Sequence, residues 1–549
     1  MKTFLRGFLK VAVVLLIVIL VLQIFLSLFG DGYVGQRLKN SIRQSSDNRY
    51  ALRYDDLDLG LLSRSVEFQN LRLAADTSQS DSLKAKRSLI QGTIPHLNIS
   101  GIGVWDYFFS DALTIGTITL EEPRLGYQPG NPGSSNKKQE QSSFSTLDST
   151  LYHALPNQLK ALSVGQFSVN NGRFVLYDKA TAQDSSIWVN GLNFSLNNIH
   201  VDSTTAQSGR YFITDDLNIE FDTLGRHLSN DLYTFSINNF RLSGKNKSLS
   251  TDSLQLQPRY PKHEFARQKG TETDRVTLTV SHITLGDIDF NQSINKRKLY
   301  AKTGTIEQPR LQIFHDKSLP PAPPDKDTFP HVAFKQLDTK IKLDTLDITN
   351  GYISYAQQKA DLNKPGIVSF EKLFATFKGI SNYEEDLNDN HFLKLHTRSK
   401  VMGTGGLNVR LNFPMGDNNG QHSIKGSLDR MQAASFNEAT EYMALVRFKE
   451  GILHNLVFSM DLNNYGAQGT LTVDYENFSI DMLKKKNDQL QGEKKFISFI
   501  ANTFAMHKSN HEPPLPEVEF KFKRTEQKSI FNLWWKSLLT GLKKQMNTF

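Results

Sequence analysis

The residues from Val11 to Phe29 form an apolar run in which only Gln23 and Ser27 carry polar side chains. At about 1.5 Å of rise per residue, a helix of this length is roughly 28 Å long, which is close to the thickness of the hydrocarbon core of a membrane. No apolar run of comparable length occurs elsewhere in the 549 residues. The sequence therefore predicts one membrane-spanning anchor at 11–29.

A cleaved signal peptide is the alternative interpretation of this run. Such peptides have an apolar region of about 7 to 15 residues that ends in small residues, whereas this run is longer and leads into Gly30 and Asp31. Basic residues within 1–10 favour a cytoplasmic N-terminus and place the rest of the chain across the membrane. The basic residues on the far side, Arg37, Lys39 and Arg43, weaken that orientation.

The composition predicts many short strands. There are 36 Phe and 17 Tyr, with frequent Asn, Asp, Ser and Thr, a mixture typical of strands joined by polar turns. The net charge of +8 is spread along the chain without a recognisable nucleic-acid module, which argues against nucleic-acid binding and favours anionic lipid surfaces. The absence of cysteine excludes disulfides and thiolate chemistry, and it fits a space outside the cytoplasm.

Residues 94–204 resemble residues 278–383, which indicates an internal duplication. Both copies contain the tripeptide GTI followed shortly by PRL, and then a polar segment rich in Pro or Gly that is expected at the surface. The tripeptides begin at Gly116 and Pro123 in the first copy and at Gly304 and Pro309 in the second.

Each copy also contains an Asn-Gly pair, at 171–172 and at 350–351, flanked by alternating apolar residues. Asn-Gly is the favoured two-residue hairpin turn, so the two arms would place their apolar side chains opposite one another on one face. That face either binds lipid or packs an ordinary core, and the pattern favours neither. Its residues are Phe167, Val169, Phe174, Leu176, Leu346, Ile348, Ile353 and Tyr355.

Two local changes of pattern lead to further expectations. The alternation of apolar residues shifts phase at Asn70, which predicts a β-bulge. The charged segment 483–495 interrupts the strand pattern, and we expect the sheet to end before it. Beyond it, apolar residues at helical spacing in 496–504 predict a helix, and VEFKFKR predicts one strand.

The segment from Ser529 to Met546 is predicted to be an amphipathic helix with an unusually broad apolar surface. Its two Trp and its Lys residues suit a membrane boundary, so we expect contact with a membrane or a membrane-bound partner. The alternative is an ordinary cap that covers the last strand and shields the core. The contact candidates are Trp534, Trp535, Lys536, Leu538 and Leu542.

Signatures of catalysis, of cofactor binding and of metal binding are missing. His511-Glu512 is followed by prolines and lacks the second His of a zinc-binding helix, and the Gly-rich run at 403–406 opens a strand instead of a phosphate-binding turn. The 14 His are dispersed along the chain. We therefore expect no enzyme, no cofactor and no metal.

Several segments, taken in order, resemble the AsmA-like proteins of Gram-negative bacteria, and especially a Bacteroidetes-type branch. They are the N-terminal anchor, the GTITLEEPRL and GTIEQPRL strands, the INNFRLSGKNKSLSTDSLQLQPRY stretch, and the C-terminal strands followed by FKFKRTEQKSIFNLWWKSLLTGLKK. The resemblance implies an inner-membrane, single-pass protein with the bulk of its chain in the periplasm. It also implies a mainly β fold, an elongated, curled antiparallel sheet of the repeating β-groove type found in TamB and in bridge-like lipid transfer proteins.

These observations predict a sequence of regions along the chain. They are a cytoplasmic N-terminus at 1–10, the anchor at 11–29, a first β-groove region at 30–204, connecting strands at 205–277, a second, duplicated β-groove region at 278–390, an AsmA-like C-terminal β region at 391–482 and a helical, amphipathic cap at 483–549.

The resemblance implies that the protein carries phospholipid along an apolar groove toward the outer membrane and contributes to outer-membrane biogenesis and homeostasis. An open groove keeps acyl chains dry while head groups remain in water. The partners implied are phospholipid, the inner membrane, and the outer membrane or a protein in it. The alternative is a membrane-tethered, non-catalytic scaffold for outer-membrane protein assembly, in which the apolar face is fully covered.

Overall fold

The structure is a computed structural model. It describes residues 50–60, 62–75, 89–103, 106, 109–128, 160–177, 185–202, 214, 216–228, 231–290, 298–321, 328–388, 390–486, 489–492 and 509–547. The predicted anchor at 11–29 and the helix expected at 496–504 lie outside these residues. Among the residues that are described, no helix is both long enough and apolar enough to cross a membrane.

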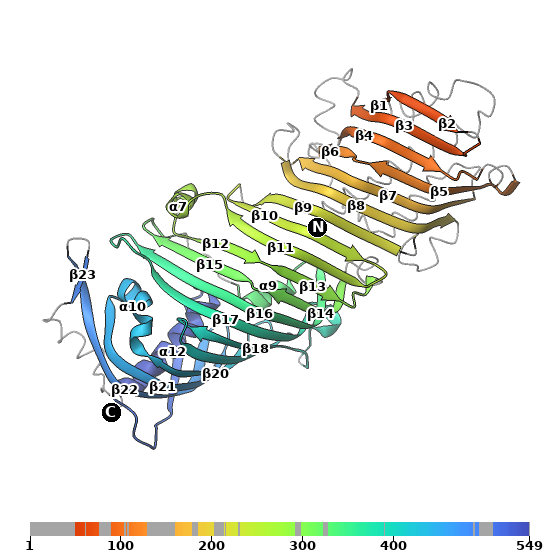
Figure 1. The fold of residues 1–549 in the computed structure, drawn as a ribbon. Helices are drawn as coiled ribbons and strands as arrows, with labels where there is room; N and C mark the ends of the chain where they lie inside the picture. The colour runs from red at the N-terminus through yellow and green to blue at the C-terminus, as the bar shows by residue number, and fades with distance from the viewer. Residues whose placement is uncertain are drawn as a thin grey trace, which may run out of the picture. The chain divides into compact units, whose positions relative to one another are not determined.

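The prediction of a mainly β protein is confirmed, and the chain divides into two compact units (Figure 1). The first unit comprises Met1–Asn230, Phe235–Asp252 and Asp287–Lys298, and the second comprises Asp231–Thr234, Ser253–Gly286 and Leu299–Phe549. Three of the described strands have residues in both units: β10 (Tyr233–Ser243), β11 (Ser248–Pro258) and β14 (Lys298–Glu307), whose first residue Lys298 belongs to the first unit.

Among the residues described, nine further strands belong to the first unit. They are β1 (Tyr50–Arg53), β2 (Asp56–Gly60), β3 (Ser65–Ala75), β4 (Leu89–Ser100), β5 (Ala112–Glu121), β6 (Arg124–Gln128), β7 (Ala161–Tyr177), β8 (Ser185–Asp202) and β9 (Asp216–Leu228).

The second unit contains most of β14 and the remaining strands that the structure describes, together with helices of 3 to 18 residues. The strands are β12 (Thr273–Val280), β13 (His282–Gly286), β14 (Lys298–Glu307), β15 (Arg310–Lys317), β16 (Lys340–Lys359), β17 (Gly366–Ser381), β18 (Phe392–Val401), β19 (Gly405–Pro414), β20 (His422–Gln432), β21 (Val446–Leu462), β22 (Gly466–Lys486), β23 (Gln489–Gly492) and β24 (Val518–Lys523). The helices are α7 (Lys262–Lys269), α9 (Pro330–Lys335), η1 (Glu384–Asp386), η2 (Ala433–Phe436), α10 (Asn437–Ala444) and α12 (Ile530–Asn547).

The prediction of an antiparallel sheet is confirmed only in part, because the antiparallel pairs are accompanied by parallel ones. In the first unit β5 and β6 both pair with β7 in parallel, and in the second unit β15 pairs with β16 in parallel. The chain between β6 and β7, and between β15 and β16, is long enough to return to the same end of the sheet before the next strand begins, as a parallel pair requires.

The two predicted hairpin turns are also wrong. Asn171 and Asn350 lie inside the continuous strands β7 and β16, each with a φ of 51°, and the register with the following strand shifts at the adjacent Gly. Asn-Gly therefore forms a β-bulge here. The neighbouring strand decides between the two structures, because backbone hydrogen bonds of Glu122 and Pro123 hold β7 in extended pairing on both sides of Asn171.

Residues whose backbone has a left-handed conformation lie side by side on neighbouring strands, and we call this set of residues the kink line. In the first unit it includes Asn70, Glu122 and Asn171, with φ of 49°, 48° and 51°. The residues that precede them are joined through His96 in one row of directly opposite residues. The predicted change of phase at Asn70 is confirmed, but the register on both sides of Asn70 continues without a shift, so it is a kink and not a bulge.

The two segments that resemble each other in sequence also share their strand pairing. In both, the strand that ends in Glu pairs antiparallel with the preceding strand. The Arg that follows Pro pairs with that same strand, β4, in the first segment, and with β12, the strand just before β13, in the second. The equivalent pairs are His96–Glu121 and Thr93–Arg124 in the first segment, and His282–Glu307 and Thr279–Arg310 in the second.

The C-terminal part of the second unit is closed by helices. The helix α12, drawn at the C-terminal end of the unit in Figure 1, packs against β22 and β24, and its buried residues Ile530, Leu533 and Met546 join the apolar cluster formed by β18 to β24. The predicted strand and amphipathic helix are therefore present as β24 and α12. The sheet does not end at the charged segment, since β22 continues to Lys486 and pairs with β23.

Candidate functional site

One face of the first unit carries rows of apolar residues that lie directly opposite one another across neighbouring strands. Such side chains contact each other on one side of the sheet. Two of the predicted lipid-facing residues, Phe167 and Val169, belong to these rows and are buried in the core of the unit. The row through Val169 runs from Phe68 through Leu97, Leu120, Val169 and Phe194 to Ile219.

The other two predicted residues of this unit lie beyond the kink line. Phe174 is half-buried and packs against the same core as Phe167, so the bulge at Asn171 keeps apolar residues on one face although the alternation changes phase. Leu176 is half-buried and lies opposite Ile187. In the first unit the predicted face is therefore mainly core.

The second unit has a comparable row that is largely half-buried, which we call the leucine row. It crosses six strands, and each member lies directly opposite the next. Only its last member is fully buried, and all the others are half-buried. The leucine row consists of Leu256, Leu278, Leu311, Ile353, Phe370 and Val401.

Two parallel rows lie next to the leucine row on the same face, because their residues are two positions away along each strand. The tyrosine row is apolar apart from its phenol and is also half-buried. The polar row follows it. The tyrosine row consists of Val276, Ile313, Tyr355 and Val368, and the polar row of Asp274, His315, Gln357 and Gly366.

The polar row carries acidic groups around one imidazole. His315 Nδ1 lies 2.7 Å from Asp274 Oδ1, and His315 Nε2 lies 3.7 Å from Glu272 Oε2. The His315 ring stacks on Tyr355, with ring centroids 6.4 Å apart. Burial, followed by the charges of Asp274 and Glu272, raises the pKa of the Tyr355 phenol well above its ordinary value, so the phenol stays neutral.

The face passes from an open part to a covered part along the leucine row. Phe370 packs against the apolar cluster that α12 and the segment of α9 help to close, and Val401 is a buried member of that cluster. At the end of the polar row α10 touches the sheet, because a Cβ on Gly366 would lie 2.6 Å from Met443 Cγ. Toward β11 and β12 the row residues keep part of their surface exposed.

The remaining predicted residues of this unit, Leu346 and Ile348, are half-buried on β16 before the bulge at Asn350. They lie opposite Phe377 and Ala375 of β17. Ile353 and Tyr355 lie beyond the bulge in the leucine and tyrosine rows. Sequence reasoning missed most row members, although the alternation in LQLQ, TLTV and RLQIF was a signal for them.

The five contact candidates on α12 face in two directions. Trp534, Leu538 and Leu542 pack against the apolar cluster, and Trp534 Nε1 donates a hydrogen bond to His422 Nε2 at 2.8 Å. Trp535 and Lys536 are exposed, with 56% of Trp535 accessible. Trp534, Leu538 and Leu542 therefore fit the predicted cap. The predicted membrane contact would be made by Trp535, Lys536 and the neighbouring Phe531, which is 63% exposed.

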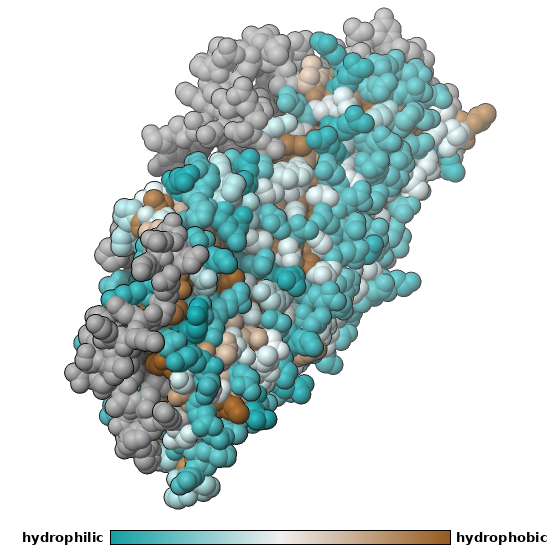
Figure 2. All heavy atoms as spheres, turned by 60° about the vertical axis from the view of Figure 1, so that its left-hand side comes forward, coloured by the Kyte–Doolittle hydropathy of each residue, from teal (hydrophilic) through white to brown (hydrophobic). Residues whose placement is uncertain are grey.

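On the face drawn in Figure 2, hydrophobic residues are scattered among hydrophilic ones. Single exposed apolar side chains are ordinary on protein surfaces. We therefore take the leucine, tyrosine and polar rows as the candidate site.

The chain matches no family model, and a comparison with curated proteins finds no relative. The resemblance to AsmA-like proteins therefore stays a prediction, and function is argued from the rows.

Proposed function

We propose that the protein binds phospholipid along the apolar face of its sheet and carries it from the inner toward the outer membrane. The observation that carries this proposal is the half-buried leucine row with the tyrosine and polar rows beside it. An acyl chain on the first two rows is removed from water, while the head group lies at the polar row. Each buried methylene contributes about 0.8 kcal/mol.

The dimensions of the row suit an acyl chain. Six strands are separated by five spacings of about 4.8 Å, so the leucine row is about 24 Å long, compared with roughly 15 Å for one leaflet of a hydrocarbon core. The carboxylates of Asp274 and Glu272, at the polar row, favour an amine-bearing head group over a purely anionic one, because they attract its positively charged ammonium group.

A scaffold with covered faces is the second candidate, and the first unit favours it. There Phe167 and Val169 are fully buried, as packed sheets require and an open groove does not. The two functions therefore differ for the second unit, where the row residues are partly exposed: lipid transport predicts lipid bound on these rows, and a scaffold predicts none.

Photocrosslinking tests the proposal with a matched pair of neighbouring residues. Leu311 belongs to the leucine row, and Gln312 is exposed on the opposite face of the same strand. A photoreactive side chain at 311 should capture phospholipid that co-purifies with the full-length protein in mild detergent, and one at 312 should not. Phosphatidylethanolamine should compete better than phosphatidylglycerol. Equal labelling at both positions, or at neither, would favour the scaffold.

A charge placed in the row gives an independent test. Ile353→Glu should abolish lipid co-purification, since a carboxylate on the apolar face must be desolvated when a chain binds. Gln312→Glu adds the same charge on the exposed face and should leave lipid content unchanged. Lipid retained in Ile353→Glu at the wild-type level would contradict the proposal.

A further inference from the structure

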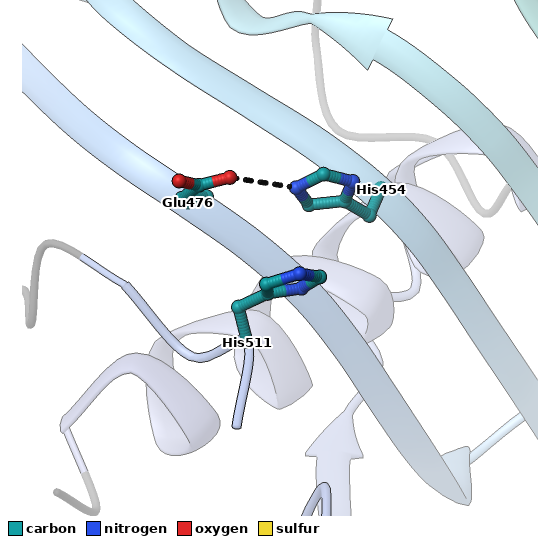
Figure 3. A group of neighbouring side chains, drawn as sticks. All are labelled: His454, Glu476 and His511. Atoms are coloured by element: carbon teal, nitrogen blue, oxygen red, sulfur yellow. Dashed lines mark hydrogen bonds and ion pairs between the residues drawn. The ribbon is translucent and has the colours of Figure 1, made fainter. Parts of the chain in front are cut away.

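Three side chains with metal-binding groups meet beside β22 (Figure 3). His454 comes from β21, Glu476 from β22, and His511 from the segment that precedes β24. One ligand atom of each lies within 4.8 Å of the others. His454 Nε2 is 3.1 Å from Glu476 Oε2, and the two imidazole rings have centroids 4.3 Å apart.

Backbone structure brings these groups together. His454 is the extra residue where the register of β21 with β22 shifts between Leu453 and Asn455, and a bulge of this kind redirects a side chain. The segment that carries His511 is fixed to the edge of β22, where Asn510 N donates to Tyr475 O at 2.8 Å. The Asn510 side chain also donates to the carbonyl of Val473 at 2.9 Å.

A second layer of contacts orients the ligand atoms. Asp474 Oδ1 lies 2.7 Å from His511 Nδ1, an arrangement in which Nδ1 carries the proton and Nε2 keeps its lone pair. Asn477 Nδ2 donates to Glu476 Oε1 at 3.1 Å, which leaves Oε2 for another partner. Carboxylates that hold the far nitrogen of a ligating imidazole are usual around protein metal sites.

We propose that His454, Glu476 and His511 bind one divalent transition-metal ion of the zinc class, with Asp474 as a positioning residue. Imidazole and carboxylate are ligands of such ions, whereas calcium requires six to eight oxygens. With bonds of about 2.0 Å, two ligands of a tetrahedral ion lie about 3.3 Å apart, close to the separation of His454 Nε2 and Glu476 Oε2. The side chains are half-exposed, so a solvent molecule completes the coordination.

Two independent ion pairs are the competing interpretation of this cluster. They would be His454 with Glu476 and His511 with Asp474. Two separate pairs leave the stacked rings, whose centroids lie 4.3 Å apart, without a common partner, whereas one cation would bind both rings.

The proposed ion has a structural consequence that is independent of lipid binding. It would join β21, β22 and the segment around His511 through side chains, in addition to the backbone contacts of Asn510. That segment leads into β24 and then α12, which closes the apolar cluster. Metal binding should therefore protect the segment from proteolysis and raise the unfolding temperature.

The test uses the untagged full-length protein, purified in mild detergent, stripped with a chelator and titrated with Zn²⁺ by calorimetry. We expect one site that is lost in His454→Gln and His511→Gln, and an affinity 10- to 100-fold lower in Asp474→Asn. Co²⁺ should give the visible absorption of a four-coordinate nitrogen and oxygen site. His396→Gln, at an exposed His that pairs with Asn408, is the matched control and should bind as the wild type does.

Two results would overturn the proposal: no Zn²⁺ binding by the wild type, or unchanged binding in both His454→Gln and His511→Gln. Circular dichroism of the stripped variants shows whether they fold. If His454→Gln fails to fold, the decision passes to Asp474→Asn and to the shift in unfolding temperature on adding Zn²⁺, which must be present in the wild type and reduced in that variant.

Discussion

Acid should destabilise the second unit through two buried histidines. His331 of α9 is 6% exposed and His422 of β20 is 1% exposed, and their rings lie 5.5 Å apart. Burial lowers the pKa of His331 to about 4, and the charges of His422 and Lys335 act in the same direction. Burial also lowers the pKa of His422 to about 4, with a further contribution from Arg524.

The direction of the effect follows from proton binding. In the unfolded chain a histidine has a pKa of about 6.5, so between pH 6.5 and 4 the unfolded state binds protons that the folded state does not. The free energy of unfolding therefore falls as the pH falls through this window. Each pH unit is worth about 1.4 kcal/mol per histidine, which gives about 2 kcal/mol each at pH 5 and an upper limit of about 4 kcal/mol for both.

Protonation also breaks a specific contact. His422 Nδ1 donates to Gly420 O at 2.8 Å, so its Nε2 is the acceptor for Trp534 Nε1. A proton on Nε2 would face the indole N–H and weaken the attachment of α12. The fluorescence of Trp534 should therefore change in the same pH range as the stability.

Urea unfolding at pH 7.5, 6.5, 5.5 and 5.0 measures the effect. His331→Phe removes one titrating group but keeps a ring between Phe329 and Phe413, whose centroids lie 5.8 and 4.7 Å from that of His331. This variant should lose about half of the pH dependence, and His396→Gln at the surface should lose none. A stability that does not change from pH 7.5 to 5.0, or an unchanged slope in His331→Phe, would refute the reasoning.

Three further outcomes are expected. Trp534→Ala should lower the free energy of unfolding by about 3 kcal/mol because it opens the apolar cluster. Trp535→Ala should change the free energy of unfolding by no more than about 0.5 kcal/mol but should reduce binding to anionic vesicles. Equal losses of stability in the two variants would exclude membrane contact by Trp535. Gly541→Leu should destabilise by about 1–3 kcal/mol in denaturant titration despite a better helix propensity, because a Cβ there lies 2.7 Å from the Phe520 ring. A reporter that is active only outside the cytoplasm should be active when it is fused after Phe549, and the mature fusion protein should retain its N-terminal 30 residues. Recovery of a soluble form that begins near Gly30 would disprove the anchor.

The strands were predictable where side-chain alternation alone defines them, as at Val66 and Phe68 before the change of phase at Asn70. The bulges were not, because a left-handed Asn before Gly suits a turn and a bulge equally. The choice at Asn171 depends on Pro123, which is distant in sequence and lies between β5 and β6, the two parallel neighbours of β7.

The candidate site was predictable only in part for the same reason. The alternation identifies Ile353 as apolar, but its place opposite Leu311 and Phe370 depends on the register of three strands. The contact of His454 with His511 is harder to predict from the sequence. It requires a bulge in β21 and pairing of the segment around Asn510 with the edge of β22.

The shared pairing of the two resembling segments gives each of them the same width across its sheet. Each segment begins with a pair of antiparallel strands and ends with a long bulged strand and its antiparallel partner. It therefore occupies four neighbouring strand positions in its sheet, which is about 19 Å at about 4.8 Å per strand. A further segment with the same pairing would add the same number of positions to a sheet without any strand changing the side that it presents.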